Sequence, residues 1–194
     1  MCRIAPLLQV RLASPFSTTV VASDASSLGQ GVVATRLPAA TIERIASWSG
    51  KYSLPGEQGA SDGDGDDSDV LRGPASADIV PAIQASTWST IVSARWRLQQ
   101  HINALEAAST LTSLRWALSR PGTTNTRMLF LSDSSVVVAA FSKGRSSSPL
   151  LIPPLRRSAM LLLASNVRLS LVWVPTEVNP ADAASRSCPR RGGQ

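Results

Sequence analysis

The sequence predicts an α/β fold in which a mixed five-stranded sheet is flanked by helices. The first part of the chain contains three segments with strand character, two of them joined by a tight turn, which is typical of an antiparallel meander. The second part alternates apolar strand-like runs with stretches of helical periodicity, which is typical of parallel βα units. A length of 194 residues suits one such domain with an insertion or a tail.

The antiparallel part begins with a buried strand over residues 18–23. A Gly-containing turn at 26–31 and a second strand at 32–37 complete a hairpin with Asp24 near its beginning. After a long stretch without periodicity, a third strand is expected over residues 86–98. These three strands form the meander.

The stretch without periodicity contains an acidic insertion. Residues 55–80 are rich in Gly, Ser, Asp and Pro, a composition that predicts disorder. Seven of the thirteen acids lie within residues 57–78, so the rest of the chain has a formal charge of about +12, against +6 for the whole. We therefore expect a domain over residues 15–187, interrupted by this insertion and followed by a basic tail at 188–194. Such a basic surface attracts nucleic-acid phosphates.

The βα part begins with a long amphipathic helix that ends before a Pro-Gly pair. The next strand, MLFL, is apolar throughout, as expected for a central parallel strand. In a later helix, Leu155, Ala159 and Leu162 are expected to face the core. The expected elements of this part are helix 103–119, strand 128–131, helix 134–142, helix 154–165, strand 168–174 and a short helix that begins at Pro180.

Several classes of protein are excluded by what the chain lacks. Cys2 and Cys188 are the only cysteines and His101 is the only histidine, so neither a disulfide framework, a zinc site nor a Ser-His-Asp enzyme is indicated. We expect His101 to cap or pack against the start of helix 103–119. No apolar stretch approaches the roughly 20 residues that cross a bilayer, so no membrane partner is expected.

Four carboxylates lie at the ends of core elements. Asp24 and Asp133 each end an apolar run, Glu106 lies beside the apolar face of the long helix, and Asp182 opens the last helix. In α/β folds the carboxyl ends of the strands form the site, so these acids are expected to meet there. Like charges this close need a cation. The sequence predicts two Mg²⁺ ions held by carboxylate oxygens, with Mn²⁺ as an alternative.

Four segments of the chain resemble a known family. ASDASSLGQGVV, HINALEA, LSDSSVVVAAFSKGRSSS and WVPTEVNPADAASR occur in that order and are similar to the ribonuclease H domain of retroelement polyproteins, of the tyrosine-recombinase and BEL/Pao kinds. The resemblance spans about residues 15–187. It implies a ribonuclease H-like fold and a four-carboxylate site that binds two magnesium ions, made of Asp24, Glu106, Asp133 and Asp182.

The resemblance also implies an activity and its contacts. The domain would cleave the RNA strand of RNA–DNA hybrids, leaving 5′ phosphate and 3′ hydroxyl ends, beside a reverse transcriptase of the same polyprotein and inside the cell, in cytoplasm or nucleus. Asn103 matches a position that senses the RNA strand near its 2′ hydroxyl. Ser26 is expected to touch the substrate backbone. Lys143 and Arg145 either bind phosphate or lie in a solvated loop.

The sequence departs from the family in the loop before the last carboxylate. Many relatives have a histidine there, whereas this chain has Val178, and Glu177 or Asn179 is expected to take its place near the substrate. An alternative hypothesis is therefore a catalytically inactive remnant that binds hybrid or structured RNA. Another nuclease or transposase on the same fold is disfavoured, because proofreading exonucleases show Asp-x-Glu where this chain has Asp24-Ala25-Ser26.

Overall fold

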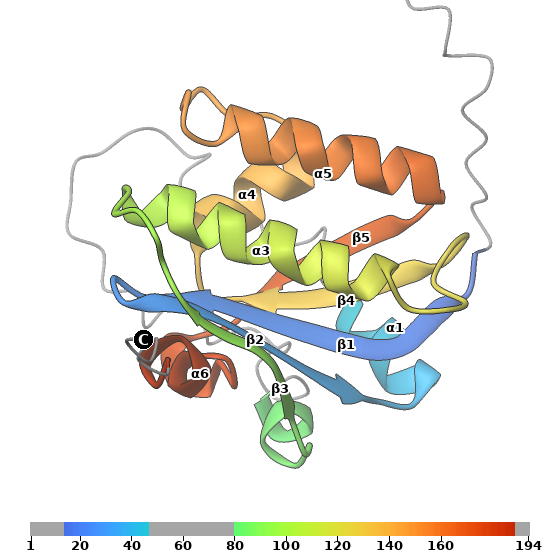
Figure 1. Cartoon of the computed structure of the whole chain (residues 1–194). Helices are drawn as coiled ribbons and strands as arrows, with labels where there is room; N and C mark the ends of the chain where they lie inside the picture. Colours follow the sequence, from blue (N-terminus) through green and yellow to red (C-terminus); the bar gives the residue numbers. More distant parts are fainter. Residues whose placement is uncertain (1–13, 47–79, 189–194) are drawn as a thin grey trace, which may run out of the picture.

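The computed structural model describes residues 14–46 and 80–188 (Figure 1). Each predicted strand and helix is present, with boundaries within about three residues of the prediction. The elements are β1 (Phe16–Ala25), β2 (Gly29–Arg36), α1 (Ala39–Ala46), β3 (Ser89–Arg95), α3 (Ile102–Leu118), β4 (Arg127–Ser132), α4 (Ser135–Lys143), α5 (Ile152–Ser165), β5 (Arg168–Trp173), the 3-10 helix η3 (Thr176–Val178) and α6 (Asp182–Arg186).

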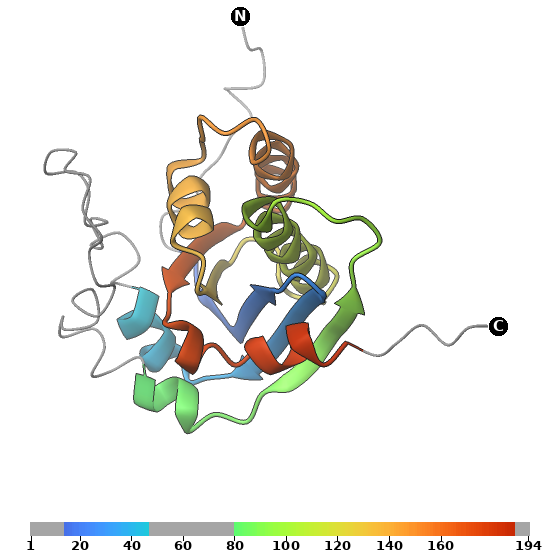
Figure 2. The same ribbon diagram turned by 90° about the vertical axis from the view of Figure 1, so that its left-hand side faces the viewer.

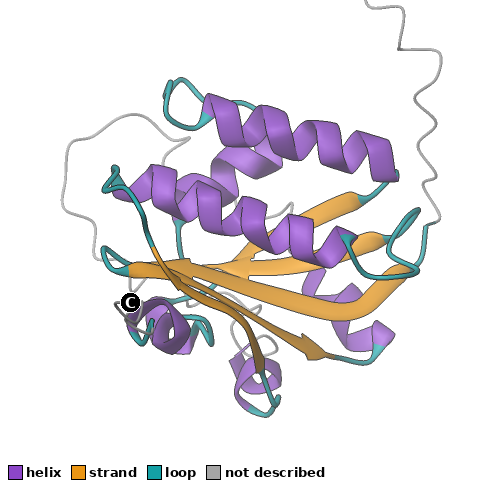
Figure 3. Ribbon diagram, in the orientation of Figure 1, coloured by secondary structure: helices purple, strands orange, loops and turns teal. Residues whose placement is uncertain are grey.

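The five strands form one mixed sheet in the order β3-β2-β1-β4-β5. The meander β1–β2–β3 is antiparallel, whereas β4 pairs in parallel with both β1 and β5. Helices α3, α4 and α5 cover one face of the sheet, and α1 and α6 cover the other (Figures 1 and 3). The view along the strands shows the sheet between these two layers (Figure 2). The predicted α/β class and mixed sheet are thus confirmed.

Side chains of the central strands alternate between two apolar clusters. In β4, Leu129 and Leu131 pack on the side of α1, while Met128 and Phe130 pack on the side of α3. All four are at most 2% exposed. A strand buried on both faces explains why this run is apolar without alternation. The burial also fixes the register of β4, since a slip of one residue would exchange its faces.

Two helical segments were not predicted. Helix α1 and residues 80–84 pack Ile42, Ile45 and Ile83 against the sheet. Of the predicted insertion 55–80, only its last residue falls within the described residues, and it is helical. Among the residues of the predicted tail 188–194, the structure describes only Cys188, which is buried.

The buried face of α5 differs from the prediction. Leu155 is buried as expected, but Ala159 is exposed and Ser158, only 2% exposed, takes its place. The reason is that the Ser158 hydroxyl donates to the carbonyl of Pro154, so this small polar side chain is accommodated in the interior. No helix within the described residues is long and apolar enough to span a bilayer.

Helix α6 approaches β2 at a position where only glycine fits. A Cβ atom on Gly31 would lie 2.4 Å from the carbonyl oxygen of Ala181 and 2.6 Å from the backbone nitrogen of Ser185. Contacts this short with backbone atoms cannot be relieved by rotating a side chain. Gly31 therefore sets the distance between α6 and the sheet.

We expect Gly31→Ala to lower the free energy of unfolding by about 3 kcal/mol, because the added methyl group must push α6 off β2. Urea denaturation measures this change. Gly144→Ala is the control, since Gly144 has a φ of 64° and open space around it, so only backbone strain of about 1 kcal/mol is expected. Equal losses in the two variants would contradict the close-packing explanation.

Candidate metal centre

The parallel pairing of β1 with β4 brings two carboxylates together. Ser23 of β1 is in register with Ser132 of β4, so the next residues, Asp24 and Asp133, emerge side by side at the same end of the sheet. The Asp133 backbone is held by β5, where the indole nitrogen of Trp173 donates to its carbonyl at 2.9 Å. The carboxyl end of parallel strands thus forms the site, as α/β folds generally do.

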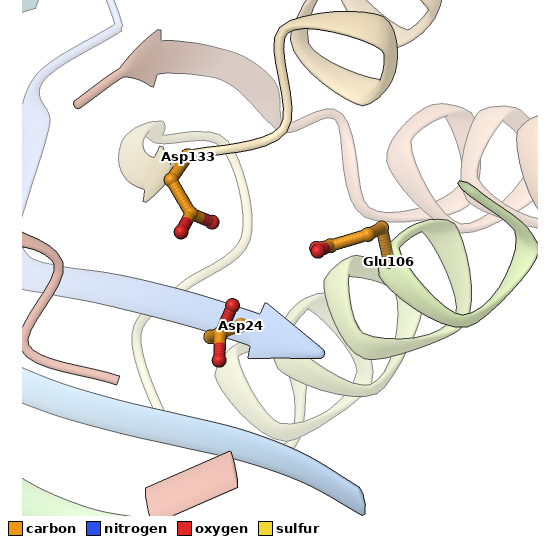
Figure 4. A group of neighbouring side chains, drawn as sticks. All are labelled: Asp24, Glu106 and Asp133. Carbon is orange, nitrogen blue, oxygen red and sulfur yellow. The ribbon is translucent and has the colours of Figure 1, made fainter. Parts of the chain in front are cut away.

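Helix α3 supplies the third carboxylate. Glu106 lies in its second turn and is 8% exposed. Each of Asp24, Glu106 and Asp133 offers one oxygen within 4.8 Å of the others, and Figure 4 shows the three side chains converging from β1, α3 and the end of β4. His101 caps the N-terminus of this helix, since its Nδ1 atom accepts a hydrogen bond from the backbone amide of Asn103 at 3.2 Å.

Buried hydroxyl groups on α3 fasten this helix to β1. Ser109 donates to the Asp24 carbonyl at 2.9 Å, and the hydroxyls of Thr110 and Ser23 are 3.4 Å apart. Ser109, Thr110 and Ser113 have no exposed surface. Our sequence analysis did not single them out. The signal available in the sequence was the presence of these three hydroxyl residues among the apolar residues of the helix.

Burial and mutual repulsion raise the pKa values of the clustered acids. Desolvation, followed by the charges of Asp133 and Asp24, raises the pKa of Glu106 to about 9. Desolvation and the charge of Asp24 raise the pKa of Asp133 to about 6. These shifts mean that the cluster cannot hold three negative charges at neutral pH unless a positive charge offsets them.

Burial also raises the pKa of Asp24. Its first cause is desolvation, and the negative charge of Asp182 adds to the rise. A hydrogen bond from the Ser185 side chain acts in the opposite direction and favours the ionised carboxylate. The ionisation of the Asp24 carboxyl group therefore depends on Asp182 and Ser185.

The residues present fit a divalent metal ion. The donor set consists of carboxylate oxygens, which hard cations prefer. The Oδ1 atom of Asp133 is buried and has no hydrogen-bond partner, although buried polar atoms are nearly always paired. A cation bound among Asp24, Glu106 and Asp133 would both satisfy this atom and offset the repulsion. The cluster can therefore hold a metal ion.

Asp182 is not part of the three-residue cluster. It opens α6, and its Oδ1 atom accepts a hydrogen bond from Nε of Arg186 at 2.9 Å and forms an ion pair with Nη2 at 2.7 Å. The side chain is 29% exposed and near enough to Asp24 to raise its pKa. The structure thus brings three of the four predicted carboxylates together and places the fourth beside them, paired with arginine.

Two residues predicted to contact substrate have hydrogen-bond partners within the protein. The Ser26 hydroxyl donates to the carbonyl of Ser185 at 3.0 Å and accepts from two amides of its own turn. The Asn179 side chain is 5% exposed and donates to the Ser23 carbonyl at 3.2 Å. The side chains of Thr176 and, to a smaller extent, Asn179 oppose the rise in the pKa of Asp133.

The other predicted contacts lie on the surface. Asn103 is half-buried and lies one turn before Glu106 on α3. Lys143 and Arg145 are exposed on either side of Gly144, the C-cap of α4. In η3, Glu177 is exposed, whereas Val178 packs against the core cluster of the α1 side.

Comparison with solved structures identifies the fold. LC11-RNase H1, isolated from compost by a metagenomic approach, is similar with a TM-score of 0.50 and 13% identity over 88% of this chain and 94% of that chain. Its complex with an RNA/DNA hybrid has a TM-score of 0.44 and 12% identity, over 86% and 92% of the two chains. The N-terminal RNase H domain of a Mycobacterium tuberculosis protein has a TM-score of 0.48 and 16% identity, over 86% and 94%.

The fold is ribonuclease H-like, as the resemblance implied. No protein-family model matches the chain, and no curated protein matches it in sequence. At 13% identity, the structural similarity shows the fold alone.

The raised pKa values predict that the metal-free protein loses stability as the pH rises. Between 4.5, the ordinary pKa of Glu106, and about 9, its value in the fold, the folded protein binds more protons than the unfolded chain. Replacing this titratable group in Glu106→Gln removes the cost of protonating it on folding. The variant should therefore raise the free energy of unfolding by about 1–2 kcal/mol at about pH 8 without metal, and flatten its pH dependence.

Urea denaturation across this pH range, with and without Mg²⁺, measures both effects. Mg²⁺ should stabilise the native protein more at the alkaline end, because metal binding requires ionised carboxylates. Glu177→Gln is the matched control, since Glu177 is exposed and outside the cluster. If the free energy of unfolding of Glu106→Gln keeps the pH dependence of the native protein, this dependence does not come from Glu106.

Proposed function

We propose that this protein is a metal-dependent endonuclease that cleaves the RNA strand of RNA–DNA hybrids, leaving 5′ phosphate and 3′ hydroxyl ends. The observation that carries this proposal is the cluster of Asp24, Glu106 and Asp133 at the carboxyl end of β1 and β4, on a ribonuclease H-like fold. The basic composition outside the insertion suits a polyanionic substrate.

We assign Asp24, Glu106 and Asp133 as ligands of Mg²⁺, with Mn²⁺ as a substitute that takes similar donors. Two bound ions would lower the pKa of an attacking water and offset the charge on the leaving 3′ oxygen. Asp182 is the proposed fourth ligand, and to serve as one it must share its carboxylate with Arg186 or release it. The carboxylates supply the negative charge and the buried hydroxyls of α3 hold them in place.

We assign surface residues of α3 and of the C-terminal end of α4 to the hybrid. Asn103, one turn before Glu106, is suited to test for the 2′ hydroxyl that distinguishes RNA from DNA. Lys143 and Arg145, at the end of α4, are suited to bind the phosphates of the hybrid.

The four sequence segments support an origin in a retroelement. In that setting a reverse transcriptase domain of the same polyprotein would be the partner, and it would add to the grip on the hybrid. The place of action would be inside the cell, in cytoplasm or nucleus, where the hybrid intermediates of such an element are made.

A second candidate function is that of an inactive remnant that binds hybrid or structured RNA. The observation in its favour is Val178, which packs against the core where many relatives have a histidine. The exposed carboxylate of Glu177 is the nearest titratable replacement within η3. The converging carboxylates favour the active enzyme over this alternative.

Cleavage of a labelled RNA–DNA hybrid in the presence of Mg²⁺ separates the two functions. We expect the native chain to cut only the RNA strand, and Asp133→Asn to reduce the rate more than about 100-fold, because loss of even an indirect partner of a metal site costs 10–100-fold. A folded native protein that binds hybrid but does not cleave it, with Mn²⁺ also supplied, would establish the remnant.

The contribution of Arg145 is expected to appear in the salt dependence of hybrid binding. Arg145→Ala, tested in chelator to prevent cleavage, should lower the slope of log K against log salt by about 1, because one phosphate contact is lost. The control is Arg168→Ala, an exposed arginine at the start of β5 and thus at the opposite end of the parallel strands. Equal slopes for the two variants would reject the assignment.

A further inference from the structure

The Ser185 side chain joins α6 to the first carboxylate of the cluster. Ser185 has no exposed surface, and its hydroxyl donates to Oδ2 of Asp24. The same hydroxyl lies 2.9 Å from the carbonyl of Asp182, one turn earlier in α6. We propose that Ser185 is a positioning residue that orients Asp24 for metal binding, an inference that rests on the proposed function.

Groups other than the Ser185 hydroxyl also dock α6. Ser93 of β3 donates to the Ala184 carbonyl at 2.8 Å, and Ser26 donates to the Ser185 carbonyl at 3.0 Å. Both bonds hold the backbone of α6, and the absent side chain of Gly31 allows the close approach. Because the helix is fastened through its backbone, the Ser185 hydroxyl remains for the carboxylate.

Asp24 needs such a partner because its neighbours repel it. Its backbone carbonyl is fixed by Ser109 from the α3 side, but this bond leaves the side chain free to rotate. The carboxylates of Glu106 and Asp133 lie on one side of it, and Figure 4 shows one Asp24 oxygen directed toward them and the other directed away. Ser185, donating to Oδ2, opposes this repulsion and fixes the torsion of the side chain.

The hydrogen bond also favours the ionised carboxylate that a cation requires. A donor to a carboxylate oxygen stabilises its charged form, and Ser185 is the largest influence acting against the effect of burial on Asp24. Groups that hold metal ligands in this way typically change metal affinity when removed. The position of the Ser185 hydroxyl and its effect on the charge of Asp24 therefore both support a positioning role for Ser185.

The test is Mn²⁺ binding by the full chain, measured by calorimetry without nucleic acid. We expect Ser185→Ala to weaken Mn²⁺ binding about tenfold. Ser185→Thr keeps the hydroxyl and should bind within about twofold of the native protein, as expected if the hydroxyl and not the helix packing matters. Unfolding by urea in chelator reports whether each variant is folded.

Ser93→Ala is the matched control. It also removes one serine hydroxyl that bonds α6, but that hydroxyl contacts backbone and lies outside the carboxylate cluster. We expect it to lower stability in chelator as much as Ser185→Ala does, and to change Mn²⁺ affinity less than about twofold. Equal losses of affinity in both serine-to-alanine variants would overturn the proposal, since docking of α6 would then explain them.

These experiments distinguish the positioning role of Ser185 from the proposed nuclease activity. Mn²⁺ binding that depends on Ser185 in a protein that cleaves no hybrid would support the positioning role and reject the nuclease. Cleavage and Mn²⁺ binding that are both unchanged in Ser185→Ala would support the nuclease and reject the positioning role. Failure of the native protein to bind Mn²⁺ would reject both.

Discussion

Repulsion among three carboxylates at one end of the sheet is the constraint on which the rest of the site depends. Asp24, Glu106 and Asp133 converge from β1, α3 and the end of β4, and burial raises the pKa of each. The charge of Asp24 further raises the pKa values of Glu106 and Asp133. Bringing them together costs folding free energy when no cation is present. The surrounding structure must therefore hold each of them against a force that would separate them, and a bound cation would make the arrangement favourable.

Hydrogen bonds from hydroxyl groups provide much of this restraint. Ser109 of α3 holds the Asp24 backbone from one face of the sheet, and Ser185 of α6 holds its side chain from the other. Small hydroxyl side chains suit this task because they bond at short range and leave little polar surface unpaired in the interior. Both faces of the sheet thus contribute to the metal centre, although two of the three clustered carboxylates come from the strands themselves.

The helices on the two faces of the sheet contribute different groups to the site. On the α3 side lie Glu106 and Asn103, together with the basic end of α4. On the α6 side, Gly31 sets how closely the last helix approaches the sheet, and Asp182 of this helix pairs with Arg186.

The sequence by itself determined the order of strands and helices and the acids that matter. Apolar periodicity marked the elements, and a carboxylate at the end of MLFL or VVAS was conspicuous because charge is costly there. The sequence analysis did not predict helix α1 or the helical residues 80–84. It also did not predict the hydrogen bonds that Ser26 and Asn179 make within the protein. Only the tertiary structure decided that Ser185 reaches Asp24 across 161 residues of chain. Such contacts depend on how closely elements distant in sequence approach each other, and local periodicity contains no measure of that distance.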